Sequence, residues 1–308
     1  MMVKKLRVAV ACFALVALAA GCGGDADPQG VTQKALASSD PDGIPSLPST
    51  PQQGLLKGKS LPLEDYMQTY EQTVTITNAV GALQTECMAK YGFDFEAPPA
   101  GRTPPPNDND VNIERRYGIS DPALAKQHGY GIAERGQQTG AEMPELSAAA
   151  ALVMSGRSGK GGGADTTPSH KGKEIPEGGC SGWSVRKVGA DAIDMSLASK
   201  LSYESLAKSQ EAPAVRAALK EWSGCLKAEG YEAATPFDAM DLAKTDGAEV
   251  SVAVADIDCK ESTNLVGIWL AEETKIQRSQ IEQNQLELNE AKENNLAAVK
   301  AAEKALRN

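Results

Sequence analysis

The sequence predicts a mostly α-helical, disulfide-stapled domain with a long C-terminal helix, preceded by a signal peptide and a disordered tether. Apolar residues recur at helical spacings from Leu63 onward, and no proline interrupts residues 260–306. Aromatic residues make up only 5% of the chain, which disfavours large antiparallel β-sandwiches and barrels. A chain of 308 residues is long enough for one such body with tails.

Residues 1–21 have the pattern of a signal peptide: basic residues, an apolar run at 8–18, and small residues before Cys22. The apolar run is shorter than the roughly 20 residues of a membrane span. Small residues before a cysteine resemble the lipobox of bacterial lipoproteins, although Ala19 stands where leucine is usual. We therefore expect Cys22 to be acylated and to hold the protein to membrane lipid. The alternative is an ordinary secretory signal.

Residues 22–61 are rich in Gly, Pro, Ser, Asp and Gln and have no amphipathic period. This composition predicts a lipid-anchored disordered linker. The formal net charge is −10 and no dense basic block is present. These charges argue against nucleic acid as a partner and against a basic face that binds anionic lipid.

Four cysteines remain in the predicted folded part, and in an exported chain they predict two disulfides. Three connectivities are possible. We favour Cys87–Cys180 and Cys225–Cys259, because each bond then joins a cysteine at a helix end to the next cysteine along the chain. No Cys-x-x-Cys occurs, which disfavours a redox site or a metal cluster. We expect no metal and no cofactor.

The predicted body spans residues 62–259, and a helix occupies 63 to about 90 at its start. That helix ends in Cys-x-x-x-x-Gly-aromatic, and the same pattern recurs with Gly230 and Tyr231. A glycine in the left-handed conformation lets the next aromatic residue fold back on the helix, so the repeat predicts two stapled helix stops.

The rest of the body is predicted to consist of shorter helices around a flexible loop at 155–174. Asp121 and Pro122 open one helix that ends at Gly129, and Pro144 opens another to about Met154. The later helices run from Asp191 to about Ser209, from Pro213 through Cys225, and after Gly247 to Cys259.

Residues 260–308 are predicted to form the long C-terminal helix. Its first half carries apolar residues that can pack on the body, whereas Gln and Asn dilute its second half. One interpretation is a solvated helix on the domain or against the helix at 63–90. The other is a docking arm for an envelope protein, in which residues 283–308 fray alone and gain order on the partner.

The best candidates for ligand or partner contact are Arg115, Arg116, Tyr117, His128 and Tyr130. A doubled Tyr-Gly-Ile could present two rings beside guanidinium groups, as an anionic or sugar-like ligand would require. The alternative is that the rings plug and cap a small helical domain. The chain has only two histidines, and we assign no catalytic residues.

Several segments together resemble a family of uncharacterised secreted lipoproteins from actinobacteria, over roughly residues 60–308. The segments are the lipobox, the two helix stops, Ile175-Pro-Glu-Gly-Gly-Cys180, Trp222-Ser-Gly-Cys225 and the run from Cys259 to Trp269. The resemblance implies an envelope location and a shared stapled helical body. It supplies no catalytic residues.

The sequence thus favours a membrane-anchored envelope lipoprotein with a non-enzymatic binding or scaffolding role. One alternative is a solute-binding lipoprotein of a transporter system, which the lack of alternating βαβ patterns disfavours. An extracytoplasmic enzyme is a further alternative, which the shortage of histidine disfavours.

Overall fold

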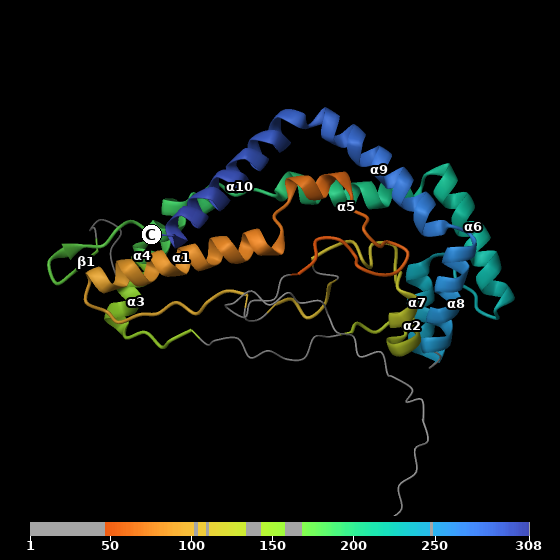
Figure 1. Ribbon diagram of the computed structural model, residues 1–308, viewed down its shortest axis with the longest axis horizontal. Helices are drawn as coiled ribbons and strands as arrows, with labels where there is room; N and C mark the ends of the chain where they lie inside the picture. The colour runs from red at the N-terminus through yellow and green to blue at the C-terminus, as the bar shows by residue number, and fades with distance from the viewer. Residues whose placement is uncertain are drawn as a thin grey trace, which may run out of the picture. The chain divides into compact units, whose positions relative to one another are not determined.

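The computed structural model describes residues 47–101, 104–108, 111–133, 143–157, 168–246 and 249–307, which all lie in one unit of mutual contacts (Figure 1). The predicted signal peptide, Cys22 and the predicted linker up to residue 46 lie outside this part of the chain.

The described residues are mostly helical, as predicted, with one two-stranded antiparallel hairpin. The α-helices are α1 (Tyr70–Lys90), α2 (Pro122–His128), α3 (Ala148–Ser155), α4 (Gly179–Val188), α5 (Ser196–Gln210), α6 (Pro213–Ala228), α7 (Pro236–Asp246), α8 (Glu249–Ser262), α9 (Leu265–Gln283) and α10 (Gln285–Leu306). The 3₁₀ helices are η1 (Pro62–Tyr66) and η3 (Ala190–Ala192), and the strands are β1 (Ser169–His170) and β2 (Lys173–Glu174).

The largest hydrophobic core lies among α2, α6, α7, α8 and α9, where Trp222 and Trp269 are fully buried. A smaller core joins the end of α1 to α3 and α4 around Cys87 and Cys180. Two further clusters join α10 to α1 and to η1 with α5. Figure 1 shows α10 beside α1 and α9 beside α5, in agreement with their contacts.

The chain already packs on the body at Leu47, so the boundary predicted at residue 61 is too late. Leu56 is fully buried in the largest core. The Leu55 N–H donates to the Ser120 carbonyl at 2.8 Å. Residues 47–61 have the composition of a linker, but three of their four leucines, Leu47, Leu56 and Leu61, are buried.

Gly54 and Gly58 offer a matched test of this packing. Both have positive φ, 72° and 65°. A methyl group at Gly54 would clash with the Ser120 carbonyl oxygen, whereas one at Gly58 would meet open space. Gly58→Ala should therefore lower the free energy of unfolding only by the strain of a left-handed alanine, about 1–2 kcal/mol. Gly54→Ala should lower it by clearly more, because the clash adds to this strain. Urea unfolding measures both. Equal costs would mean that residues 47–61 do not pack on the body.

The prediction of one helix from Leu63 to about Lys90 is wrong about where the helix begins. The chain forms η1, is extended at Met67, and begins α1 at Tyr70. A capping box defines this start: the Thr69 hydroxyl accepts from the Gln72 N–H at 3.2 Å, and the Gln72 side chain accepts from the Thr69 N–H at 3.1 Å.

Both predicted disulfides, Cys87–Cys180 and Cys225–Cys259, are confirmed, with Cα–Cα distances of 5.6 and 5.7 Å. They indicate an oxidising, extracytoplasmic location. None of the described helices is long and apolar enough to cross a membrane.

Both predicted helix stops are confirmed as well. Gly92 and Gly230 have φ of 81° and 95°. The Phe93 N–H donates to the Met88 carbonyl at 3.1 Å, and the Tyr231 N–H donates to the Leu226 carbonyl at 3.1 Å. Each is the backbone pattern of a Schellman motif.

Two shorter helices begin later than predicted. The helix predicted from Pro144 begins at Ala148, because the Ser147 hydroxyl caps it by accepting from the Ala150 N–H at 3.3 Å. The helix predicted from Asp191 begins at Ser196, and Asp191 lies in η3 instead. Within the loop predicted at 155–174, the described residues include the hairpin of β1 and β2.

The long C-terminal helix is present, but in two segments. Asn264, with φ of 51°, separates α8 from α9, and Asn284 separates α9 from α10. Ala298 and Ala302 of α10 are buried in the cluster shared with Ile76 and Ala79 of α1. The interpretation of a helix lying against α1 is confirmed, whereas the docking-arm interpretation expected residues 283–308 to fray without a partner.

Candidate functional site

The predicted Arg–Tyr cluster is built into the core. The Arg116 guanidinium pairs with Glu273, and the Tyr117 hydroxyl donates to the same carboxylate at 2.8 Å. Ser205 donates to it as well, at 2.6 Å. Glu273 and Gln277 are fully buried, and the Gln277 side chain accepts from the Leu63 N–H at 3.0 Å. Burial beside Glu273 raises the pKa of Tyr117, which keeps its hydroxyl a donor.

Tyr130 makes the equivalent contact one helix earlier. Its hydroxyl donates to the Asp256 carboxylate at 3.1 Å, and the Lys260 ammonium lies 2.9 Å from the same carboxylate. Lys260 also donates to the Ile119 carbonyl at 2.8 Å, and the Trp222 indole donates to Asp256 at 3.0 Å. Burial lowers the pKa of Lys260 and raises the pKa of Asp256, while their attraction opposes both shifts.

Arg115 and His128 complete the predicted set. The Arg115 guanidinium donates to the carbonyls of Tyr130 and Gly131, at 2.6 and 3.2 Å. His128 is the last residue of α2. The polar groups of Arg115, Arg116, Tyr117 and Tyr130 bond within the protein, on the two sides of α2. This arrangement favours the interpretation as plugs that fasten the loop to α8 and α9.

The buried partners Glu273, Asp256 and Lys260 were missed from the sequence. A weak signal was present, since Asp256 and Lys260 are four residues apart in an otherwise apolar helical stretch.

Burial raises the pKa of Glu64 above the ordinary value of 4.5. The charges of Arg116 and Glu273 also act on this carboxyl, Arg116 lowering its pKa and Glu273 raising it. The folded state therefore binds more protons than the unfolded state just above pH 4.5, and stability is lost as pH rises through the folded pKa. Glu64→Gln keeps an acceptor for the Leu61 N–H but removes the titration. The stability of Glu64→Gln relative to wild type should rise between pH 4 and pH 7, as urea midpoints would show. A constant difference would contradict this account.

A groove beside the Cys87–Cys180 disulfide is the stronger candidate. Its volume is about 620 Å³, within the range of small-molecule sites. Cys87, Lys90, Tyr91, Lys173, Glu174, Ile175, Pro176 and Trp183 line it. The lining comes from the end of α1, from β2 and the residues after it, and from α4. Cys87, Ile175 and Pro176 lie in segments that the sequence singles out for other reasons, and nothing in the sequence pointed to the lining as a ligand site.

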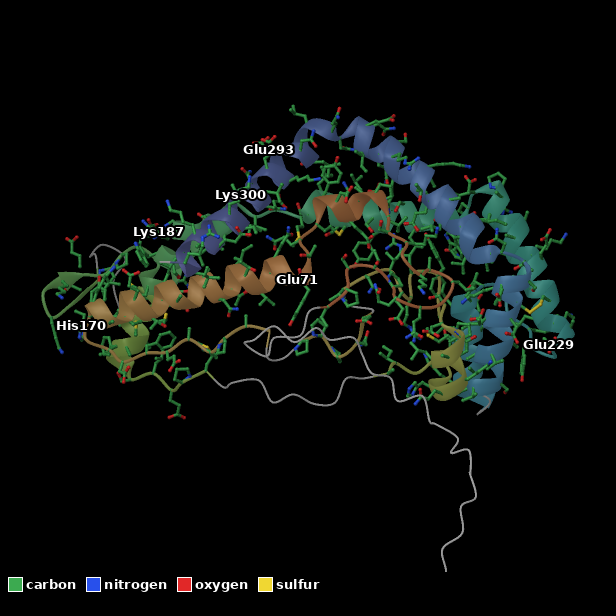
Figure 2. The ribbon with its side chains drawn as sticks, in the orientation of Figure 1. Glu71, His170, Lys187, Glu229, Glu293 and Lys300 are labelled. Carbon is green, nitrogen blue, oxygen red and sulfur yellow. A yellow bond between two sulfur atoms is a disulfide. The ribbon has the colours of Figure 1, made fainter. Side chains whose placement is uncertain are left out.

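Several bonds fix the groove walls. The disulfide joins α1 to α4, and the Lys173 ammonium donates to the Lys90 carbonyl at 2.8 Å. The Tyr91 hydroxyl donates to the Glu174 carbonyl. The strand β1 is fastened by His170, labelled in Figure 2, whose ring lies 4.9 Å from that of Phe93. The groove is therefore largely preformed.

The side chains of the groove combine cations with aromatic rings. The Lys90 ammonium lies 5.1 Å from the centre of the Trp183 ring and 2.7 Å from the Glu86 carboxylate. Trp183 is half-buried, whereas Trp222 and Trp269 are fully buried. A signal for this pairing existed: Lys90 and Trp183 each lie three residues after a cysteine of the same disulfide.

A second cavity, of about 220 Å³, lies between η1 and α10. It includes Lys292, whose ammonium lies 5.1 Å from the centre of the Tyr66 ring. It is smaller than the usual small-molecule site. The described residues contain no cluster of His, Cys, Asp and Glu suited to a metal ion.

Comparisons with protein families, with curated proteins and with solved structures find no match to the chain.

Proposed function

We propose that this chain is an envelope lipoprotein, anchored through acylated Cys22, that acts by binding rather than by catalysis, and that the groove at the Cys87–Cys180 disulfide is its binding site. The observation that carries the binding role is the groove itself, where two lysines and two aromatic rings meet on bonded walls. The resemblance to actinobacterial lipoproteins belongs to this proposal.

The residues before Cys22 support the anchor, and the two disulfides support export to an oxidising compartment. Mass spectrometry of the mature protein should find an acylated Cys22 at the N-terminus, and Cys22→Ala should leave an unlipidated protein that is either soluble or keeps its signal peptide uncleaved. An unmodified N-terminus at another residue would contradict the anchor.

The binding role is tested by thermal unfolding with a panel of sugars, peptides and metal ions. A ligand that binds the folded state stabilises it by about 2.7 kcal/mol at a hundredfold excess over its Kd. We expect a saturable rise in Tm that Trp183→Ala abolishes. A saturable rise that Trp183→Ala leaves unchanged would place binding outside the groove.

A protein partner on α10 stays a prediction. Leu286 and Leu296 of α10 are exposed, at 84% and 38%, although other residues of this helix pack on α1.

A further inference from the structure

The groove lining carries more positive than negative side chains, although the chain is acidic, with a formal net charge of −10. Lys90 and Lys173 line the groove with one carboxylate, Glu174, and Glu86, which is not among the lining residues, pairs with Lys90 at 2.7 Å. Two ammonium groups in one groove of an acidic protein favour a negatively charged ligand at that groove.

Both lysines keep hydrogen-bonding capacity for such a ligand. An ammonium group has three donors, and Lys173 uses one for the Lys90 carbonyl. Lys90 pairs with Glu86, but the two side chains are 56% and 58% exposed. An exposed pair of this kind stabilises little, so a ligand anion can compete with Glu86.

The remaining lining indicates what carries the negative charge. Tyr91 and Trp183 supply flat rings, and Ile175 and Pro176 are the aliphatic residues of the lining. A lipid chain would need a longer aliphatic wall. A sugar ring has an apolar C–H face for an aromatic ring and polar edges for ammonium and carbonyl groups.

We propose that the groove binds an acidic saccharide, with a sugar ring against Tyr91 and Trp183 and its carboxylate or phosphate held by Lys90 and Lys173. This inference rests on the proposed binding function and adds the class of ligand. The disulfide and the hydrogen bonds of Lys173 and Tyr91 already fix the groove walls. Binding therefore costs little conformational entropy in the protein.

Tryptophan fluorescence reports on this groove selectively. Of the three tryptophans, Trp222 and Trp269 are fully buried in the largest core, so Trp183 is the one that a ligand can touch. The oxidised full-length protein is titrated at low salt with digalacturonate, glucose 6-phosphate, lactose, inorganic phosphate and tetraglutamate. We expect digalacturonate or glucose 6-phosphate, or both, to change the emission saturably, and lactose and inorganic phosphate to bind at least tenfold more weakly. The two acidic sugars distinguish a carboxylate from a phosphate.

Variants separate the groove from general electrostatics. Lys90→Gln and Lys173→Gln should each weaken binding of the acidic sugar about tenfold, because each removes a charge-assisted hydrogen bond. The matched controls, Lys200→Gln and Lys220→Gln, each make the same change in net charge at an exposed position, on α5 and on α6, and each should leave the affinity unchanged. Trp183→Phe should abolish the fluorescence change, while calorimetry still detects binding.

The outcomes distinguish this inference from the function it rests on. If tetraglutamate binds through Lys90, Lys173 and Trp183 and neither acidic sugar does, the groove is a binding site and the saccharide class is wrong. If lactose binds as tightly as the acidic sugars, the role of the lysines is wrong. If no probe changes the emission and the wider thermal panel gives no shift that depends on Trp183, the binding role of the groove fails as well.

Discussion

Lys260→Met is expected to lower the free energy of unfolding by about 3–5 kcal/mol, because it leaves the buried Asp256 carboxylate without its cation. Both side chains of this pair are fully buried. Lys260→Met/Asp256→Asn should recover much of the loss, because the amide is neutral. Its oxygen can accept from the Trp222 indole, and its NH₂ group can donate to the Tyr130 hydroxyl. Urea unfolding of the oxidised protein measures the three proteins.

Lys244→Met provides the matched control. Lys244 pairs with Asp241 at 3.1 Å, but the two side chains are 58% and 75% exposed. Its loss should cost no more than about 1 kcal/mol. Similar costs at Lys260 and Lys244 would show that the network holding Tyr130 contributes little to stability.

Removal of the Cys87–Cys180 disulfide is the second large effect. The bond spans 93 residues, against 34 for Cys225–Cys259. Loop-closure entropy then predicts a loss of about 4–5 kcal/mol for the double serine variant at the first bond and about 3–4 kcal/mol at the second.

The two variants should differ more in function than in stability. The cluster around Cys87 and Cys180 is small, so the groove should open when that bond is lost and acidic sugars should no longer bind. Cys225 and Cys259 belong to the largest core, and their replacement should leave binding intact. Equal binding by both variants would show that the groove does not depend on its disulfide.

Local features were predictable from the sequence. The helix stops depend on a glycine, the next aromatic residue and a residue within the last turn, all close in the chain. The disulfide pairing followed from the positions of those stops. Thr69 was missed although its capping box with Gln72 is a local signal. The break before α1 also has a distant partner, since the Gln68 N–H lies 3.2 Å from the Met195 sulfur.

The packing of α10 was missed for a different reason. Alanines carry a weak apolar signal, yet Ala298 and Ala302 allow close approach to Ala79 of α1. The buried Asn295 adds a bond, since its side chain accepts from the Asp194 N–H at 3.1 Å. A count of apolar residues detects neither contribution.

The candidate site was the least predictable part. A pattern of Arg and Tyr with no visible partner indicates a ligand, but Tyr130 and Asp256 are 126 residues apart and meet only in the fold. The groove draws on three segments, and a short span of sequence shows no more than one of them.

If the groove is the binding site, a ligand contacts the groove and leaves Arg115, Arg116, Tyr117 and Tyr130 untouched. Hydrogen exchange of the oxidised protein, with and without saturating digalacturonate, tests it directly. We expect slower exchange confined to amides near Tyr91 and residues 173–175, and unchanged exchange at residues 115–117 and 130–131. Slower exchange at residues 115–117 with none near Tyr91 would contradict it.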